Sequence, residues 1–129
     1  EEFDYGEESF FATKADGGIY TSVREFINWE KALRKNILIS EKMTNDAHSP
    51  KIKIEEIVDN YYGYGWFIEK RADYPTKIYH TGDNGGFQIY AARYPEENIL
   101  ILIFSNRNDK NREENAYSID QKHKKAGWL

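Results

Sequence analysis

The chain has 129 residues, with 22 acidic and 18 basic side chains that give a formal net charge of -4 at pH 7. This length corresponds to one domain or to one part of a larger domain. The basic residues are scattered, apart from Lys122, Lys124 and Lys125, and this argues against nucleic-acid binding. The absence of Cys excludes disulfide and thiol chemistry. No apolar run approaches the roughly 20 residues of a membrane helix, so we expect no membrane span.

The first part of the chain predicts an irregular entry followed by a helix. Residues 1–13 mix acidic and aromatic side chains, which indicates irregular or short extended structure. Ser22 and Glu25 have the spacing of a capping box, which satisfies two backbone N–H groups at the start of a helix. Asn36 is a suitable left-handed stop. Between them, apolar residues recur at the three- and four-residue spacing of a helix face: Val23, Phe26, Ile27, Trp29 and Leu33.

A second, shorter helix is predicted from a cap at Ser40 to about His48. Pro50 limits it, because the residue before a proline is displaced from helical geometry. The stretch from Lys51 to Asn60 contains three Ile residues at irregular spacing, and it is compatible with a strand or with a loop.

From Tyr61 onward the chain consists of short aromatic and β-branched runs separated by turn residues, which predicts antiparallel strands. The four predicted strands are Tyr62 to Glu69, Lys77 to Thr81, Phe87 to Tyr94 and Ile99 to Phe104. Asp83 to Gly86 and Pro95 to Asn98 have the composition of tight turns. Residues 108–129 predict a closing polar helix. The expected fold class is therefore α+β, an antiparallel β meander with flanking helices.

Five groups of residues in this chain resemble landmarks of a known family. They follow one another in the order Gly17 to Ser22 before the helix with Trp29, then Tyr64-Gly65-Trp66, then His80-Thr81-Gly82 with Gly86-Phe87, then Tyr94-Pro95-Glu96, then Ile103 to Asn106. Each group alone is a weak signal. The ordered set resembles the C-terminal half of class C β-lactamase-like and penicillin-binding-protein-like serine hydrolases.

The resemblance implies that residues 1–129 form a single partial domain of the β-lactamase and transpeptidase type. The chain begins at Glu1 and its single Met is Met43, so we expect it to be part of a longer translated protein. The missing partner would be the N-terminal half of the same protein. The resemblance also suggests a periplasmic or secreted location, which no residue of the chain establishes.

The family's acyl-transfer site has three parts, and only one of them is visible in this chain. The family uses a Ser-x-x-Lys nucleophile, a Tyr-x-Asn or Ser-x-Asn element and a Lys-Thr-Gly or His-Thr-Gly strand. The chain has no Tyr-x-Asn or Ser-x-Asn triplet. Its six Ser residues are followed three positions later by residues other than Lys: Ala12, Glu25, Met43, Ile52, Asn108 and Gln121. The catalytic set is incomplete, and the chain alone should form no acyl-enzyme.

The visible part is His80-Thr81-Gly82, followed by Asp83. By resemblance, His80 would offer a donor or a charge to the substrate, Thr81 a hydroxyl, and Gly82 room for close approach. The backbone N–H of Asp83 would join the oxyanion hole, where one preorganised donor is worth about 3 kcal/mol. The alternative is that His80 bonds only to its neighbours and Gly82 serves only the turn. His in place of Lys, and an acid at Asp83, depart from typical β-lactamases and favour esterase-like or peptidase-like relatives.

The remaining conspicuous residues indicate no cofactor. His48 and His123 have no metal-ligand spacing with His80 or with the acidic residues, so we expect no metal site. Gly82, Gly85 and Gly86 lack the Lys-Ser/Thr ending of a phosphate-binding loop. No cofactor of any kind is predicted.

Two classes of function remain open. The chain is either the C-terminal part of a hydrolase that acts on β-lactams, D-amino-acid peptides or esters, or a non-catalytic module that binds peptide or cell-wall fragments. In the family, the strand that corresponds to residues 98–105 lies beside a strand from the N-terminal half. Its sequence, Ile99 to Phe104, is continuously apolar and carries no charge or proline that would blunt an exposed edge. We therefore expect it to be covered by a second copy in a homodimer, or by residues 1–13.

Overall fold

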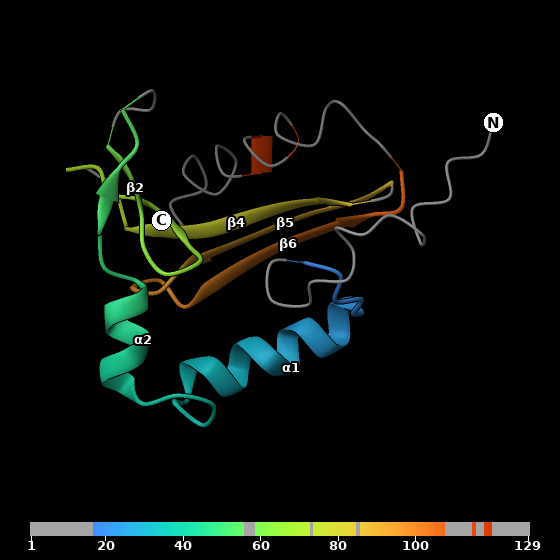
Figure 1. Cartoon of the computed structure of the whole chain (residues 1–129), viewed down its shortest axis with the longest axis horizontal. Coiled ribbons are helices and arrows are strands. Elements are labelled where there is room, and N and C mark those ends of the chain that lie inside the picture. Colours follow the sequence, from blue (N-terminus) through green and yellow to red (C-terminus); the bar gives the residue numbers. More distant parts are fainter. Residues whose placement is uncertain are drawn as a thin grey trace.

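The computed structural model describes residues 17–55, 59–72, 74–84 and 86–107, together with residues 115, 118 and 119. Two helices come first, α1 (Val23–Arg34) and α2 (Glu41–Ala47). Six strands follow: β1 (Ile52–Lys53), β2 (Asn60–Tyr62), β3 (Phe67–Glu69), β4 (Lys77–Asn84), β5 (Phe87–Tyr94) and β6 (Ile99–Ser105). They form one antiparallel sheet in the order of the chain, with the helices beside it (Figure 1). The predicted α+β meander with flanking helices is confirmed.

Helix α1 begins and ends where its local sequence predicts. Ser22 is the N-cap, and the Glu25 N–H donates to Ser22 Oγ at 3.2 Å. This bond satisfies one of the backbone donors that every helix start leaves without an intrahelical partner. The helix ends at Arg34, and Asn36 follows with a φ of 55°. Asn tolerates this left-handed conformation better than most residues, so it stops the helix as predicted.

Helix α2 has the same kind of start. Ser40 is its N-cap, and the Met43 N–H donates to Ser40 Oγ at 3.3 Å. His48 is the C-cap, and Pro50 follows two residues later. The short helix predicted between Ser40 and His48 is confirmed.

The prediction of one strand from Tyr62 to Glu69 is wrong. A turn separates β2 from β3, in which the Gly63 N–H donates to the Trp66 carbonyl oxygen at 2.8 Å and Gly65 has a φ of 78°. Aromatic and β-branched residues on both sides of the turn made the run look continuous. Glycine at position 65 supplies the positive φ that reverses the chain there. The preceding stretch, Lys51 to Asn60, was compatible with a strand or a loop, and its residues 52 and 53 form β1, which pairs with β2.

The later strands agree better with their predicted bounds. β4 extends beyond the predicted end at Thr81, because residues 82–84 also pair with β5. Asn84 pairs with Phe87, so the connection between these strands is a two-residue hairpin loop. β5 has the predicted bounds, and β6 has the predicted start and one further residue, Ser105. The turn predicted at residues 95–98 is confirmed, whereas the turn predicted to begin at Asp83 begins later, because Asp83 and Asn84 belong to β4.

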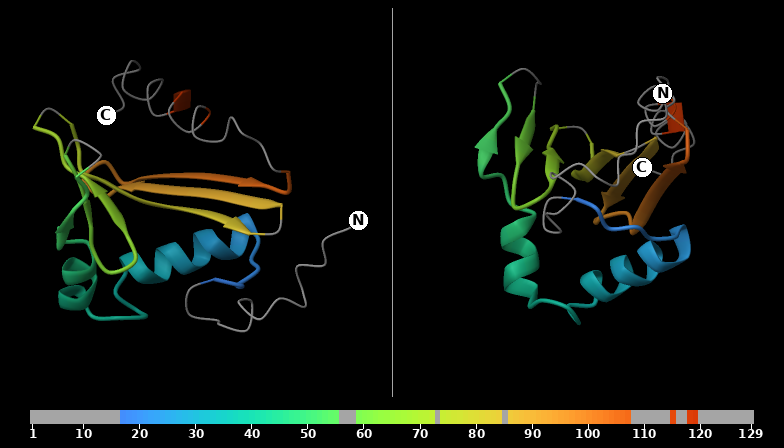
Figure 2. Two further views of the ribbon diagram at one scale, coloured as in Figure 1. Left: turned by 45° about the horizontal axis from the view of Figure 1, so that its top comes forward. Right: turned by 45° about the vertical axis from the view of Figure 1, so that its right-hand side comes forward.

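The two faces of the sheet have different cover. One face carries the core cluster of Tyr90, Ala92, Tyr94 and Ile101, against which Ile119 packs. The other face meets α1, where the rings of Phe26 and Phe104 touch edge-on with centroids 5.6 Å apart. Figure 2 shows α1 and residues 115, 118 and 119 on opposite sides of the sheet. Cover on both faces accounts for the continuous apolar sequence of β6.

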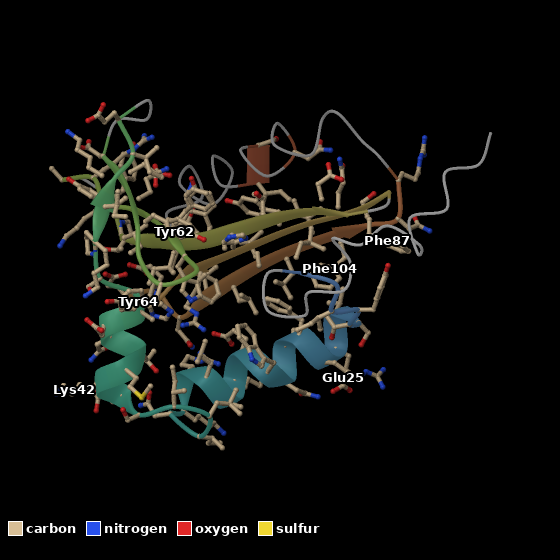
Figure 3. All side chains as sticks on the ribbon, in the orientation of Figure 1. Glu25, Lys42, Tyr62, Tyr64, Phe87 and Phe104 are labelled. Carbon is tan, nitrogen blue, oxygen red and sulfur yellow. The ribbon has the colours of Figure 1, made fainter. Side chains whose placement is uncertain are left out.

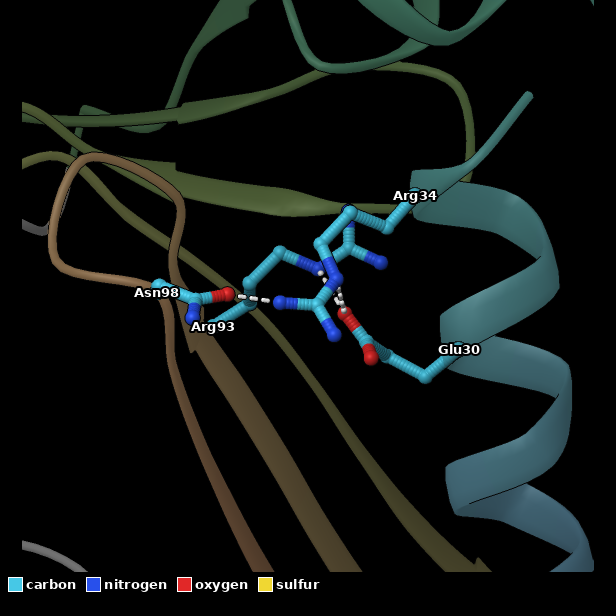
Figure 4. A network of polar contacts seen from close by, with 4 residues as sticks. All are labelled: Glu30, Arg34, Arg93 and Asn98. Carbon is cyan, nitrogen blue, oxygen red and sulfur yellow. Dashed lines mark hydrogen bonds and ion pairs between the residues drawn. The ribbon is translucent and has the colours of Figure 1, made fainter.

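A buried polar network joins α1 to the sheet (Figure 4). Glu30 and Arg93 are only 4% and 6% exposed, and Arg93 Nε lies 3.1 Å from Glu30 Oε1. Arg34 reaches the same carboxylate at 3.8 Å and also donates to Asn98 Oδ1 in the turn between β5 and β6. The network therefore fixes the end of α1 against the β5–β6 hairpin.

Two sequence predictions lie wholly or mostly outside the described residues. These are the irregular entry at residues 1–13 and the closing helix at residues 108–129, of which only residues 115, 118 and 119 are described. Within the described ranges, no helix combines the length and the apolar character needed to cross a membrane.

Candidate functional site

The predicted site residues lie together on β4, where this strand extends past the end of β3. β3 pairs with residues 77–79 only, and its first residue, Phe67, lies opposite Tyr79. His80, Thr81, Gly82 and Asp83 continue the strand, paired with β5 on the other side. The sheet thus has a step at His80. β4 has β3 as a neighbour up to Tyr79 and is paired with β5 alone from His80 onward.

His80 is held by groups on both sides of its ring. Nε2 lies 3.2 Å from the Tyr62 hydroxyl oxygen, and Nδ1 lies 2.6 Å from the carbonyl oxygen of Thr81. The ring of Phe67 lies 5.4 Å from that of His80, between ring centroids. These contacts match the alternative in which His80 bonds to its neighbours. They do not test its proposed contact with a substrate, which stays a prediction.

Gly82 and Asp83 are fixed by side chains of β5. A Cβ at Gly82 would lie 2.8 Å from Ile89 Cγ1, so the absence of a side chain makes room for Ile89 directly opposite. Gln88 Nε2 donates to Asp83 Oδ2 at 2.8 Å. Asp83 is therefore oriented by a neighbouring amide, and Gly82 has a packing reason in addition to the catalytic one that the sequence indicates.

A pocket of ≈ 810 Å³ lies next to this strand, between the N-terminal end of α1, the start of β5 and the end of β6. It is lined by Ile19, Tyr20, Thr21, Glu25, Phe26, Trp29, Phe87, Ile89, Phe104, Ser105 and Asn106. In Figure 3, Phe87, Phe104 and Glu25 lie at this end of the sheet, whereas Tyr62 and Tyr64 lie at the other. Ile89 connects the pocket to the predicted strand, because it packs against Gly82. None of the four predicted site residues lines the pocket itself.

The walls of the pocket are mainly apolar, with five aromatic residues among the eleven that line it, and they are partly exposed. Tyr20 and Phe87 are 74% and 48% exposed, and their rings meet edge-on with centroids 5.6 Å apart. Exposed aromatic side chains in a concave site are typical of a place where a ligand or another protein segment binds. Thr21 and Glu25 supply polar groups at the start of α1.

Ser105, the serine among the lining residues of the pocket, is engaged in a local turn. Its Oγ donates to the Arg107 carbonyl oxygen and accepts from the Arg107 N–H, both at 3.1 Å. A serine nucleophile needs an adjacent base to accept its proton. The groups bonded to Ser105 Oγ are the backbone carbonyl and N–H of Arg107, neither of which can act as that base, so its surroundings are those of a turn.

No metal centre is indicated by the part of the chain that the structure describes. Within it, no three His, Cys, Asp or Glu side chains come close enough together to hold an ion. His48 and His80 lie in different surroundings, since His48 packs edge-on against Trp66 with centroids 5.4 Å apart.

Sequence reasoning missed Tyr62 and the network around Glu30. Tyr62 was one aromatic residue among several, and its contact with His80 joins positions 18 residues apart. The burial of Glu30 could have been predicted from its spacing. It follows Phe26 by four residues and precedes Leu33 by three, which places it on the apolar face of the helix. A carboxylate on such a face needs a buried partner, and Arg93 provides it.

Comparison with known proteins agrees with this fold. Penicillin-binding protein 4* of Bacillus subtilis (strain 168) is 23% identical over 104 residues, which are 80% of this chain and 23% of that protein. The crystal structure of a penicillin binding protein from Bacillus halodurans superposes with a TM-score of 0.68 at 23% identity, covering 78% of this chain and 31% of the other. This chain therefore spans less than a third of the length of either protein.

The structural likeness shows a penicillin-binding-protein-like fold, as the resemblance of the five groups of residues implied. The Beta-lactamase family model matches residues 2–124, which is nearly the whole chain. The chain belongs to the Beta-lactamase family.

Proposed function

We propose that residues 1–129 are the C-terminal part of a β-lactamase-related serine hydrolase domain, and that β4 forms one wall of its acyl-transfer site. The nucleophile would come from the N-terminal half of the same protein. The observation that carries the proposal is the extension of β4 past β3, which puts residues 80–83 at a step in the sheet beside the pocket. Membership of the family supports the reaction class.

Each residue of this wall has a proposed role. Gly82 lets the substrate backbone approach the strand, and Thr81 offers a hydroxyl. The backbone N–H of Asp83 stabilises the oxyanion of the tetrahedral intermediate, because a fixed N–H aimed at developing charge needs no reorganisation during the reaction. His80 stands where many relatives carry Lys. An imidazole is a weaker source of positive charge than an ammonium group at neutral pH, which favours ester or peptide substrates over β-lactams.

The purified chain should be inactive by itself, because it contains no Ser-x-x-Lys sequence. We expect no hydrolysis of a chromogenic cephalosporin or of a p-nitrophenyl ester. Intact-mass spectrometry should find no adduct after treatment with a penicillin or with a fluorophosphonate. Stoichiometric labelling of any of the six Ser residues would contradict this expectation.

The longer protein provides the decisive test of the hydrolase proposal. Its coding sequence should contain Ser-x-x-Lys and Tyr-x-Asn ahead of residue 1. In that protein, His80→Ala should lower turnover by about tenfold or more while the fold is retained, as expected for loss of a polar contact to the substrate. His48→Gln is the matched control, since His48 packs against Trp66, whereas His80 contacts Tyr62 and Phe67. Equal turnover in wild type and His80→Ala would remove His80 from the site.

A second candidate function is a binding module that holds peptide or cell-wall fragments without turnover. It is favoured by the contacts of His80, whose two ring nitrogens both lie within hydrogen-bond distance of protein groups. A coding sequence without the two upstream motifs, together with saturable binding of muropeptide by the intact protein, would support this function over the hydrolase.

A further inference from the structure

The contacts of His80 determine which of its ring nitrogens carries a proton. A carbonyl oxygen can only accept a hydrogen bond, so the 2.6 Å contact between Nδ1 and the Thr81 carbonyl requires a proton on Nδ1. In the neutral ring Nε2 is then an acceptor, and the Tyr62 hydroxyl at 3.2 Å donates to it.

We infer that Tyr62 is a positioning residue that fixes His80 as the neutral Nδ1–H tautomer. Any effect of this tautomer on catalysis rests on the proposed hydrolase function. The tautomer itself is inferred from the two contacts of the ring and does not depend on that function. A hydroxyl donor on one ring nitrogen sets the proton on the other, which is how second partners commonly orient a histidine.

The surroundings of Tyr62 hold its hydroxyl in place. Its ring packs edge-on against Phe67 with centroids 4.8 Å apart, and Phe67 in turn stacks on Tyr79 at 5.2 Å. The same Phe67 ring lies against His80. Tyr62, Phe67 and Tyr79 are also directly opposite one another in the register of β2, β3 and β4. The aromatic row therefore fixes the distance between the hydroxyl and the imidazole.

This arrangement has a consequence for the step in the sheet at His80. The Nδ1–H is used by the Thr81 carbonyl, and the Nε2 lone pair is used by Tyr62. Both ring nitrogens are then engaged by protein groups. The polar contact of His80 with a substrate that the proposed function expects therefore requires the bond between Tyr62 and Nε2 to open first.

The tautomer can be measured directly in the chain of 129 residues by long-range ¹H–¹⁵N correlation NMR of the histidine rings. Wild-type His80 should be protonated at Nδ1, with Nε2 in the chemical-shift range of an unprotonated, hydrogen-bonded nitrogen. In Tyr62→Phe the Nε2 acceptor loses its donor, so the fraction of Nε2–H tautomer should rise about three- to tenfold. Tyr61→Phe is the matched control and should leave the ring signals unchanged, because the described contacts of the His80 ring are with Tyr62, Phe67 and the Thr81 carbonyl.

Either of two results would overturn the inference: a wild-type ring protonated at Nε2, or an unchanged tautomer in Tyr62→Phe. If Tyr62→Phe does not fold, 3-fluorotyrosine at position 62 keeps the ring and makes the hydroxyl a stronger donor. The Nε2 signal should then move further toward the hydrogen-bonded range, and an unmoved signal would count against the inference. The two proposals can fail independently. Loss of the hydrolase proposal would not change the NMR signals of His80, and an Nε2–H tautomer would not contradict the hydrolase proposal.

Discussion

At the scale of single residues, the most unusual surroundings belong to the side chains around Trp66. His48 meets this indole edge-on, Trp29 stacks on it with centroids 6.2 Å apart, and Arg93 lies over it with Cζ 5.9 Å from the ring centroid. Burial lowers the pKa of His48 from its usual value to about 4, and the charge of Arg93 adds to this effect. His48 is therefore neutral in the folded protein at pH 7.

This lowered pKa predicts a loss of stability in mild acid. Between pH 6.5 and about 4 the unfolded chain binds a proton at His48 that the folded chain does not, so stability falls as the pH falls through this window. Since the ring is only partly buried, we expect about 1 kcal/mol, or a Tm decrease of about 3–5 °C. Differential scanning calorimetry at pH 7 and pH 4.5 measures the effect.

His48→Gln is the control for this prediction, because glutamine does not titrate in the same range. Its Tm should fall less than that of the wild type over the same pH interval. Equal decreases in the two proteins would assign the acid sensitivity to other groups.

The buried pair of Glu30 and Arg93 predicts a larger effect. Burial lowers the pKa of Arg93, and the carboxylate of Glu30 partly offsets this. Arg93 Nη2 is buried without a hydrogen-bond partner among the described residues, so the guanidinium depends strongly on Glu30. Glu30→Gln should therefore lower the free energy of unfolding by about 3–5 kcal/mol, as for other buried ions that lose their partner. Urea denaturation followed by tryptophan fluorescence measures the change.

Two further variants separate charge from packing at this pair. Arg34→Gln removes the other cation near Glu30, but its side chain is 43% exposed, so a loss below about 1 kcal/mol is expected. Glu30→Leu combined with Arg93→Met should recover most of the stability lost in Glu30→Gln, because apolar residues can replace a buried ion pair. A double variant as unstable as the single one would show that the pair has a role that packing cannot replace.

At the scale of elements, the turn between β2 and β3 is packed directly against the end of α2. A Cβ at Gly63 would overlap the carbonyl oxygen of Ala47 and lie 3.0 Å from that of Ser49. The Tyr64 N–H donates to the same Ala47 carbonyl at 3.1 Å. These obstacles are backbone atoms, which cannot move aside as a side chain would.

Gly63→Ala should accordingly destabilise the protein by about 2–3 kcal/mol, the usual range for overpacking. Gly17→Ala is the matched control, since no atom lies within 4 Å of a Cβ at that position. Urea midpoints of the two variants give the comparison. A Gly63→Ala variant as stable as Gly17→Ala would mean that α2 and the turn are less closely packed than described here.

At the scale of the whole molecule, the sheet ends with β6, which pairs with β5 along its full length. Residues 1–13, one of the two expected covers for its outer edge, lie outside the described residues. The apolar character of β6 still predicts that this edge is covered, because an exposed edge of this kind favours association.

Oligomeric state and hydrogen exchange test this prediction together. Light scattering should give a dimer if a second copy covers β6, and a monomer if residues 1–13 do. In both cases the amides from Ile99 to Phe104 should exchange slowly, at rates like those of β5, which is paired on both sides. A monomer whose alternate β6 amides exchange freely would show that the edge is open.

The sequence by itself determined the two helices, the β5–β6 hairpin and the family. Their signals are local: a cap such as Ser22, a left-handed stop such as Asn36, and apolar runs whose period or length fits one kind of element. It also grouped His80 to Asp83 as one candidate site, although it ended the strand at Thr81, and their catalytic roles stay a prediction.

Only the tertiary structure decided where β2 ends and β3 begins, because strands of two or three residues are stable only through their neighbours in the sheet. The same holds for the contacts of Tyr62 with His80 and of Glu30 with Arg93, which join residues 18 and 63 positions apart in the sequence. No local pattern reports such pairs, since chain topology brings them together and burial then requires each polar group to find its partner.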